Sequence, residues 1–289
     1  MRVLDARKIL REKGIRPRKS LGQNFLVSPR GLRAILEAAE LRDSDVVVEI
    51  GAGIGTLTVP LAERVGKVIA VEIDRRLVEI LEEICAGYPN VLLVQGDVLD
   101  FSLRQLLEQG GCPQGPCKAV GNLPYYVTSA ILRHFLENTP RPSLMVVTVQ
   151  KEVAQRMAAS PGEMSLLSVS VQFYSKPRIV CHLPAGAFYP PPEVDSAVVK
   201  LEVLPEPRLP PEEEQVFFRI VRAGFGERRK TLRNSLSRGL NLPVTQVEEA
   251  LAAASIDPQR RAESLSVEEW LALYEKLRVN LYAHQRFSK

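Results

Sequence analysis

The chain has 289 residues, of which 45% are hydrophobic and 25% are charged, and these proportions are typical of a packed globular protein rather than a disordered one. No apolar run approaches the roughly 18 residues that a membrane span needs, and the N-terminus lacks the apolar stretch of a secretory signal, so we expect a cytoplasmic protein without membrane contact. Four cysteines are too few for a disulfide framework. Cys112 and Cys117 have no second pair of ligands nearby, so we expect no metal.

The net charge of +4 is concentrated in two segments. Residues 1–30 contain nine basic and two acidic residues, and residues 222–238 contain six basic residues and one acidic residue. Either segment alone could be a solvated helix face. Two such segments in an otherwise acidic chain favour a polyanionic partner, because clustered cations displace counterions from phosphates. We therefore expect the protein to bind nucleic acid.

From residue 46 to about residue 150, short β-branched runs alternate with amphipathic segments. The runs are apolar on both faces, as buried parallel strands covered by helices are, and repeated βα units predict a doubly wound, mostly parallel sheet. The predicted strands are Val46–Ile50, Val68–Glu72, Val91–Gln95, Ala119–Asn122 and Leu144–Gln150, and the predicted helices include Asp74–Cys85 and Thr128–Glu137.

The second half of the chain does not continue the regular alternation of strands and helices. Ser165–Tyr174 fits either a strand or a helix, and Ile179–Leu183 and Ala197–Leu204 are expected to complete the sheet. Pro205–Pro211 contains four prolines in seven residues and predicts a linker. Helices are predicted at 212–238, 244–254 and 266–281. The expected organisation is an α/β domain at 1–204 with a basic segment at 1–30, a linker at 205–211, and a small all-helical domain at 212–289.

A glycine-rich turn follows the first predicted strand. Gly51, Gly53 and Gly55 form a G-x-G-x-G sequence, in which glycine lets the backbone turn tightly and approach a ligand closely. Position 56, where a dinucleotide fingerprint has its third glycine, is Thr56. The glycines alone could form any tight βα turn, but they favour a nucleotide-type ligand.

Acidic residues end the next two predicted strands. Glu72 lies 21 residues after Gly51, close to the spacing of about 20 at which a carboxylate accepts hydrogen bonds from ribose hydroxyls. Asp97 ends the third strand, where an adenine amino group could donate to it. Each acid alone could be a helix N-cap, and Asp74 is the better candidate for that role beside Glu72. The ordered set resembles the class I S-adenosylmethionine methyltransferases, whose Rossmann-like fold and cationic cofactor suit an acidic pocket.

The fourth predicted strand ends in Asn122-Leu123-Pro124-Tyr125, which resembles the N/D-P-P-Y/F motif of amino-group methyltransferases. The exocyclic nitrogen of adenine is a poor nucleophile because its lone pair is delocalised into the ring. Two acceptors, which we assign to the Asn122 side chain and the Pro124 carbonyl, would draw this nitrogen toward tetrahedral geometry. Tyr125 could stack on the target base. The alternative interpretation of this segment is a structural Asn-Pro turn followed by an aromatic ring of the core.

Beyond these motifs, most of the chain resembles the ribosomal RNA adenine dimethyltransferases. These enzymes modify two adjacent adenines near the 3′ end of small-subunit (16S) rRNA during ribosome biogenesis. The matching blocks are Lys19–Leu26, Gln150–Ala154, Ala187–Ser196, Arg228–Asn234 and Arg260–Ser266. One departure lies at Glu163–Ser168, where the family usually has a Tyr-Gly pair.

The resemblance implies S-adenosyl-L-methionine as cofactor and small-subunit rRNA in a pre-30S particle as partner, bound by a monomer. It implies that Phe188 helps to position the target base, although Phe188 could also be a buried aromatic at a strand edge. The cofactor-binding residues it implies are Asn24, Leu26, Gly51, Glu72, Asp97 and Asn122. It also implies that the helical domain binds RNA.

Two alternatives stay open. The nearest enzyme is a large-subunit rRNA adenine methyltransferase of the macrolide-resistance type, which shares Gln-Asn-Phe-Leu and Asn-Leu-Pro-Tyr. A non-catalytic RNA-binding assembly factor on the same fold is the other, and the intact Asn122–Tyr125 segment argues against it.

Overall fold

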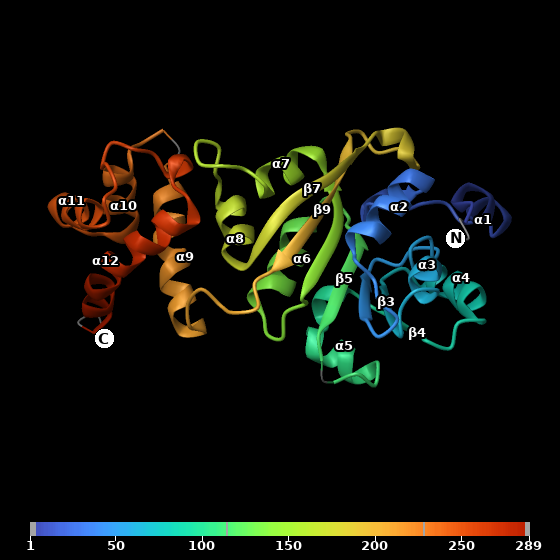
Figure 1. The fold of residues 1–289 in the computed structure, drawn as a ribbon. Coiled ribbons are helices and arrows are strands. Elements are labelled where there is room, and N and C mark those ends of the chain that lie inside the picture. The colour runs from blue at the N-terminus through green and yellow to red at the C-terminus, as the bar shows by residue number, and fades with distance from the viewer. Residues whose placement is uncertain (1–3, 114, 228, 287–289) are drawn as a thin grey trace. The chain divides into compact units, whose positions relative to one another are not determined.

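The computed structural model describes residues 4–113, 115–227 and 229–286, and side chains up to Val279 and at Leu281. The chain divides into two compact units (Figure 1). The first comprises the residues up to Gln155 together with Ser175–Pro205, and the second comprises Arg156–Tyr174 together with the residues from Glu206 onward.

The first unit is built on a seven-stranded sheet in the order β4-β3-β2-β5-β6-β9-β7. The neighbours from β4 to β6 pair in parallel, whereas β9 is antiparallel to both β6 and β7. This confirms the predicted doubly wound, mostly parallel sheet. Its strands are β2 (Val46–Ile50), β3 (Lys67–Glu72), β4 (Val91–Gln95), β5 (Cys117–Asn122), β6 (Leu144–Gln150), β7 (Ser175–Leu183) and β9 (Ser196–Val203).

Helices connect the parallel strands, as right-handed βα units require. Leu32, Leu61 and Leu81, from the helices α2, α3 and α4, belong to one buried cluster with apolar side chains of the sheet. The unit contains α1 (Ala6–Glu12), η1 (Lys19–Leu21), α2 (Pro29–Ala38), α3 (Thr58–Ala62), α4 (Arg75–Cys85), η2 (Val98–Asp100), α5 (Leu103–Gln109), α6 (Thr128–Glu137) and η3 (Ala185–Ala187), while α7 (Lys151–Met157) crosses the boundary between the units.

Two short strands far apart in the sequence form a separate ribbon in this unit. β1 (Phe25–Leu26) pairs antiparallel with β8 (Phe188–Tyr189), so that Leu26 lies opposite Phe188. The ribbon ties the N-terminal segment to the connection between β7 and β9. Neither strand was predicted, because a two-residue strand carries no periodicity.

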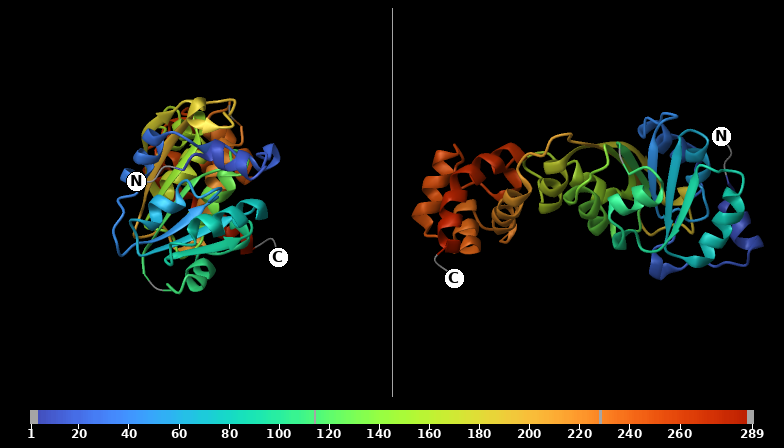
Figure 2. Two further views of the ribbon diagram at one scale, coloured as in Figure 1. Left: turned by 90° about the vertical axis from the view of Figure 1, so that its right-hand side faces the viewer. Right: turned by 90° about the horizontal axis from the view of Figure 1, so that it is seen from below.

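The second unit is helical (Figure 2). The ambiguous segment forms the helix α8 (Leu166–Tyr174), which Ser165 begins by accepting a hydrogen bond from the backbone N–H of Ser168. The single helix predicted over 212–238 is two helices, α9 and α10, separated at 226–231. The remaining elements are α9 (Pro211–Phe225), α10 (Leu232–Leu240), α11 (Val244–Ala253), η4 (Ala262–Ser264) and α12 (Val267–Arg286).

The expected division at residue 204 needs one correction, because Arg156–Tyr174 belongs to the second unit. Phe173 stacks on Phe217, with ring centroids 4.6 Å apart, and the Tyr174 hydroxyl donates to Glu214 over 2.7 Å. These contacts join a segment that precedes two strands of the sheet to the helix that follows the linker. Sequence order did not reveal them.

No helix among the described residues combines the length and the hydropathy that crossing a bilayer would require.

The second unit's core yields a first prediction. Gly224 of α9 is buried, and a Cβ there would lie 2.3 Å from Cη2 of Trp270, which is itself fully buried. We expect Gly224→Ala to lower the free energy of unfolding by about 1–3 kcal/mol, because the core must shift to admit the methyl group. Urea unfolding followed by the fluorescence of Trp270, the chain's one tryptophan, measures this.

Gly87→Ala is the matched control, since a Cβ at that position meets nothing within 4 Å. Its effect, followed by circular dichroism, should stay below about 0.5 kcal/mol. Equal effects of the two substitutions would contradict the packing argument.

Candidate active site

The glycine-rich turn after β2 has the geometry that its sequence predicts. Gly51, Gly53 and Gly55 have φ values of 73°, 61° and 85°, which side-chain-bearing residues rarely adopt. Gly51 is exposed, and the N–H groups of Gly51 and Ala52 both donate to the Val71 carbonyl. The turn therefore presents backbone without side chains at the carboxyl end of β2.

The two predicted acids lie at the same edge of the sheet, because β2, β3 and β4 run parallel and end together. Glu72 is only 6% exposed, and its carboxylate accepts hydrogen bonds from the N–H groups of Gly53 (2.7 Å) and Asp74 (2.8 Å). Burial raises its pKa. Asp97 accepts from the Leu99 N–H over 3.0 Å. Each carboxylate retains acceptor sites for a ligand's hydroxyl or amino groups.

A third acid lies beneath the glycine turn. Glu49 is 1% exposed, and its Oε2 has no hydrogen-bond partner among the described residues. Burial raises its pKa to about 8, and the neighbouring Glu72 adds to the effect. At neutral pH Glu49 is therefore mainly protonated, which spares the fold an isolated buried charge.

Asn122 lies at the carboxyl end of β5, and the N-terminal segment holds its side chain. The Asn122 Nδ2 donates to the Asn24 carbonyl over 2.7 Å, so its Oδ1 is directed away from that contact. Asn24 is itself held by donating its Nδ2 to the Gly22 carbonyl. The N-terminal segment thus fixes which end of the Asn122 amide can accept a hydrogen bond from another group.

The assignment of the Pro124 carbonyl as the second acceptor is wrong. That oxygen already accepts hydrogen bonds from the Val127 N–H (3.2 Å) and the Thr128 hydroxyl (3.0 Å), which together begin α6. A carbonyl oxygen has two lone pairs, and both are used. The Leu123 carbonyl has no hydrogen-bond partner within the described part of the chain. It is the available acceptor next to Asn122.

Tyr125 is half-buried, and its hydroxyl lies 2.6 Å from the Ser196 Oγ at the start of β9. Burial raises the pKa of its phenol, so it remains neutral. The hydrogen bond fixes the ring beside Asn122. This position suits the predicted stacking role.

Phe188 is buried in this structure, and its predicted role in positioning the target base stays a prediction. It is 1% exposed and belongs to the hydrophobic core of the first unit, because its strand pairs with β1 and directs the ring inward. The alternative interpretation, a buried aromatic at a strand edge, describes it. Leu26, opposite it, is 3% exposed, and its predicted contact with the cofactor stays a prediction.

Ile73 and Asp74 contribute to this edge in ways that the sequence does not predict. Ile73 is 46% exposed between two buried acids, which offers an apolar surface to a ligand ring. Asp74 caps α4 as expected, but its buried carboxylate also accepts from Gln23 (2.9 Å) and from the Arg76 guanidinium (2.6 Å). Arg18 lies 3.5 Å from it. Asp74 thereby fastens the N-terminal segment to the strand end, a role that local sequence cannot reveal.

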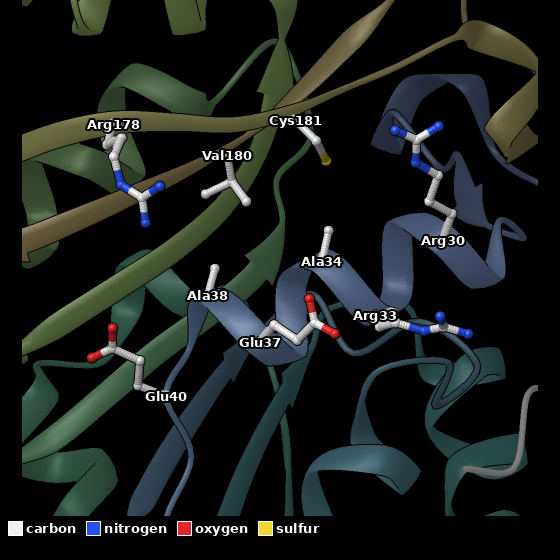
Figure 3. A pocket seen from close by; sticks show the side chains of 9 residues that line it. All are labelled: Arg30, Arg33, Ala34, Glu37, Ala38, Glu40, Arg178, Val180 and Cys181. Carbon is white, nitrogen blue, oxygen red and sulfur yellow. The ribbon is translucent and has the colours of Figure 1, made fainter.

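A pocket of about 390 Å³ elsewhere on the first unit is not part of this candidate site (Figure 3). Arg30, Arg33 and Arg178 line it, from α2 and the edge strand β7, together with Glu37 and Glu40. It contains neither the glycine turn nor an acid from a strand end. The candidate site is therefore the carboxyl edge of β2–β5.

The basic segment of the second unit is partly described. Arg229 and Lys230 are exposed, and Arg233 and Arg238 form ion pairs with Glu248 (2.9 Å) and Glu227 (2.7 Å). Arg228 lies outside the described residues.

Together these features define the class of protein. A doubly wound sheet, a glycine-rich turn after its first parallel strand and carboxylates at the ends of the next two strands are the architecture of class I S-adenosylmethionine-dependent methyltransferases. The residues fit this cofactor, since Gly51 leaves open space where a side chain would intrude, Glu72 and Asp97 can accept from hydroxyl and amino groups, and Ile73 can cover an adenine ring.

The comparisons with known proteins define the family. The family model described as ribosomal RNA adenine dimethylase matches residues 14–278, so this chain belongs to the ribosomal RNA adenine dimethylase family. The ribosomal RNA small subunit methyltransferase A of Dehalococcoides mccartyi strain CBDB1 is 49% identical over 272 residues, which are 94% of this chain and 92% of the relative. That of Moorella thermoacetica is 47% identical over 277 residues, covering 93% and 95%.

Two solved structures are similar over most of the chain. The 23S rRNA methyltransferase ErmE has a TM-score of 0.71 at 31% identity, over 88% of this chain and 100% of its own. A dimethyladenosine transferase from Plasmodium falciparum has a TM-score of 0.77 at 27% identity, over 88% and 98%.

The Asp74 contacts yield a prediction about pH. The hydrogen bonds from Arg76, with those from Gln23, lower the pKa of Asp74 from 3.8 to about 2. A lowered carboxyl pKa stabilises the fold above the unfolded value, and this contribution is lost as the pH falls through the folded value. We expect Asp74→Asn to cost about 1–3 kcal/mol of unfolding free energy at pH 7, since hydrogen bonds to a charged group are lost.

Unfolding of both proteins by urea at pH 7, 4 and 2 checks this. The difference should be constant from pH 7 to about pH 5 and should shrink between pH 4 and pH 2. A difference that is the same at pH 2 as at pH 7 would show that the charge of Asp74 contributes nothing.

Proposed function

We propose that this chain methylates the exocyclic amino groups of two adjacent adenosines near the 3′ end of small-subunit rRNA, acting as a monomer on a pre-30S particle in the cytoplasm. The geometry at Asn122 is the observation that carries the proposal. Its amide is oriented by the Asn24 carbonyl, and the Leu123 carbonyl beside it has no hydrogen-bond partner among the residues that the structure describes. The names of the relatives that are 47–49% identical support the choice of ribosomal subunit.

The residues act by binding and orienting. Glu72 and Asp97 would hold the adenosyl group through its hydroxyl and amino groups, above the glycine turn. S-adenosylmethionine, when bound, supplies an electrophilic methyl group on a sulfonium. The Asn122 Oδ1 and the Leu123 carbonyl accept hydrogen bonds from the two amino hydrogens of the target adenine, which restores the lone pair on its nitrogen. Tyr125 stacks on the base once it has left its helix.

No strong general base is needed, because the methylated nitrogen becomes acidic and can release its proton to water. Small, preorganised acceptors therefore matter more than a titrating group. The protonated Glu49 lies below the turn and is not exposed to the target base.

The competing function is methylation of large-subunit rRNA, which the similarity to the ErmE structure favours at 31% identity. A direct assay separates the two. Purified protein, S-adenosylmethionine with a labelled methyl group, and unmethylated 30S or 50S particles should give transfer to the 30S particle alone. Transfer to the 50S particle alone would overturn the proposed substrate.

Asn122→Ala tests the chemistry in the same assay. Removing an acceptor that orients the nucleophile should lower kcat by at least about 100-fold while leaving RNA binding nearly unchanged. Asn138→Ala, which removes an exposed amide of the same unit, is the matched control and should retain activity. Full transfer by Asn122→Ala would refute its role.

The basic segment provides a separate prediction. Changing Arg228, Arg229 and Lys230 to glutamine should weaken RNA binding. It should also reduce the slope of log K against log salt concentration by about 0.7–0.9 for each phosphate contact that is lost. Titrations between about 50 and 200 mM salt measure this. Arg133→Gln, at an exposed arginine paired with Glu137, is the control. An unchanged slope would remove the segment from the interface.

A further inference from the structure

Tyr126 is exposed in a way that the fold does not explain. It follows Tyr125 in the loop between β5 and α6, and its side chain is 67% exposed. Tyr126 is the one aromatic residue among the exposed large hydrophobic side chains of the described residues. Other large aromatic side chains, such as Phe135 and Trp270, are fully buried. An exposed ring beside a reaction loop is typical of a binding surface.

The loop that carries Tyr126 is fixed at both ends. On one side the Tyr125 hydroxyl bonds to Ser196, and on the other the Pro124 carbonyl accepts from Val127 and Thr128. The backbone of Tyr126 therefore lies inside a closed turn. A ring held on such a backbone loses little conformational freedom when a ligand binds.

One side of the ring rests on the N-terminal segment. Cδ1 and Cε1 of Tyr126 lie 3.4 Å from the place where a Cβ of Gly22 would stand, and Gly22 has φ of 61°. A glycine at this position lets the two segments approach. The contact supports the ring from one side while most of its surface remains open.

The surroundings favour an anionic ligand with a flat, apolar part. Residues 16–24, which lie against the loop at Gly22, contain Arg16, Arg18 and Lys19 and no acidic residue, and of these Arg18 is paired with Asp74. Lys19 is exposed and has no ion-pair partner among the described residues. A nucleotide combines the two properties, because its base stacks on an aromatic ring and its phosphate meets the cations.

We propose that Tyr126 stacks on the nucleobase next to the adenine that is being methylated. The inference rests on the proposed function, which supplies an RNA strand to the loop. When the target base leaves its stack to reach Tyr125, the neighbouring base in the strand loses a stacking partner. Tyr126, the next residue of the loop, takes the place of that partner. For two adjacent target adenosines this neighbour is itself a purine when either one reacts. Tyr126 is thus a binding residue for the flanking nucleotide rather than a catalytic residue.

Fluorescence of 2-aminopurine tests the contact directly. This base cannot be methylated at the adenine position, since its amino group is on another carbon. We would reconstitute unmethylated 30S particles whose 16S rRNA carries 2-aminopurine at one of the two target adenosines and adenine at the other. Binding of the unaltered protein should quench the fluorescence of the flanking 2-aminopurine, and Tyr126→Leu should abolish this quenching.

Kinetics on unsubstituted 30S particles provide the second readout. Tyr126→Leu should raise KM by roughly tenfold, the effect of losing one base–aromatic stack, with a smaller change in kcat. Tyr126→Phe is the matched control, because it retains the ring and loses the hydroxyl, and it should keep both the quenching and the KM. Thermal unfolding and cofactor binding of Tyr126→Leu should match those of the unaltered protein, since the side chain is exposed.

Unchanged quenching and KM in Tyr126→Leu would overturn the inference, as would a Tyr126→Phe protein as impaired as Tyr126→Leu, which would assign the effect to the hydroxyl. Transfer to 30S particles by the unaltered protein checks the proposed function in the same preparation. Its absence would overturn that function and this inference together, whereas normal transfer without quenching overturns this inference alone.

Discussion

The hydrogen bond from the Asn122 amide to the Asn24 carbonyl links the two parts of the candidate site. A neutral amide has a donor end and an acceptor end, and this bond commits the donor end to the N-terminal segment. The acceptor end is then the one that can meet an amino group. The parallel sheet brings Asn122 to the edge where Glu72 and Asp97 also lie. The segment that orients Asn122 also contacts Asp74, two residues after Glu72.

The N-terminal segment is held by contacts that differ in kind. Gln23 and Arg18 meet the buried charge of Asp74, Gly22 packs against the loop at Tyr126, and the ribbon of β1 and β8 fixes its end. Their shared effect is to hold a basic stretch of chain at one position beside the sheet edge. The sheet alone would leave that edge open to water.

Much of this could be predicted from the sequence. The boundaries of β2, β4 and β6 follow from apolar runs, and the glycine turn and the acids follow from spacing, because these are local patterns. Three of the failures were nonlocal. The Pro124 carbonyl is occupied because of the way in which α6 begins. Phe188 is buried because β8 pairs with β1, and Phe173 joins Phe217 through a tertiary contact. The break between α9 and α10 was missed because the basic segment there keeps a helix-like composition.

The pairing of Leu26 with Phe188 has a consequence for synthesis of the protein on the ribosome. Translation proceeds from the N-terminus, so β1 emerges early and has no partner strand until β8 has been made. Asn122 and Asp74 emerge between the two and can engage the segment first. The N-terminal segment is therefore fixed in stages during translation, and its backbone hydrogen bonds to β8 form only after most of the sheet has been made.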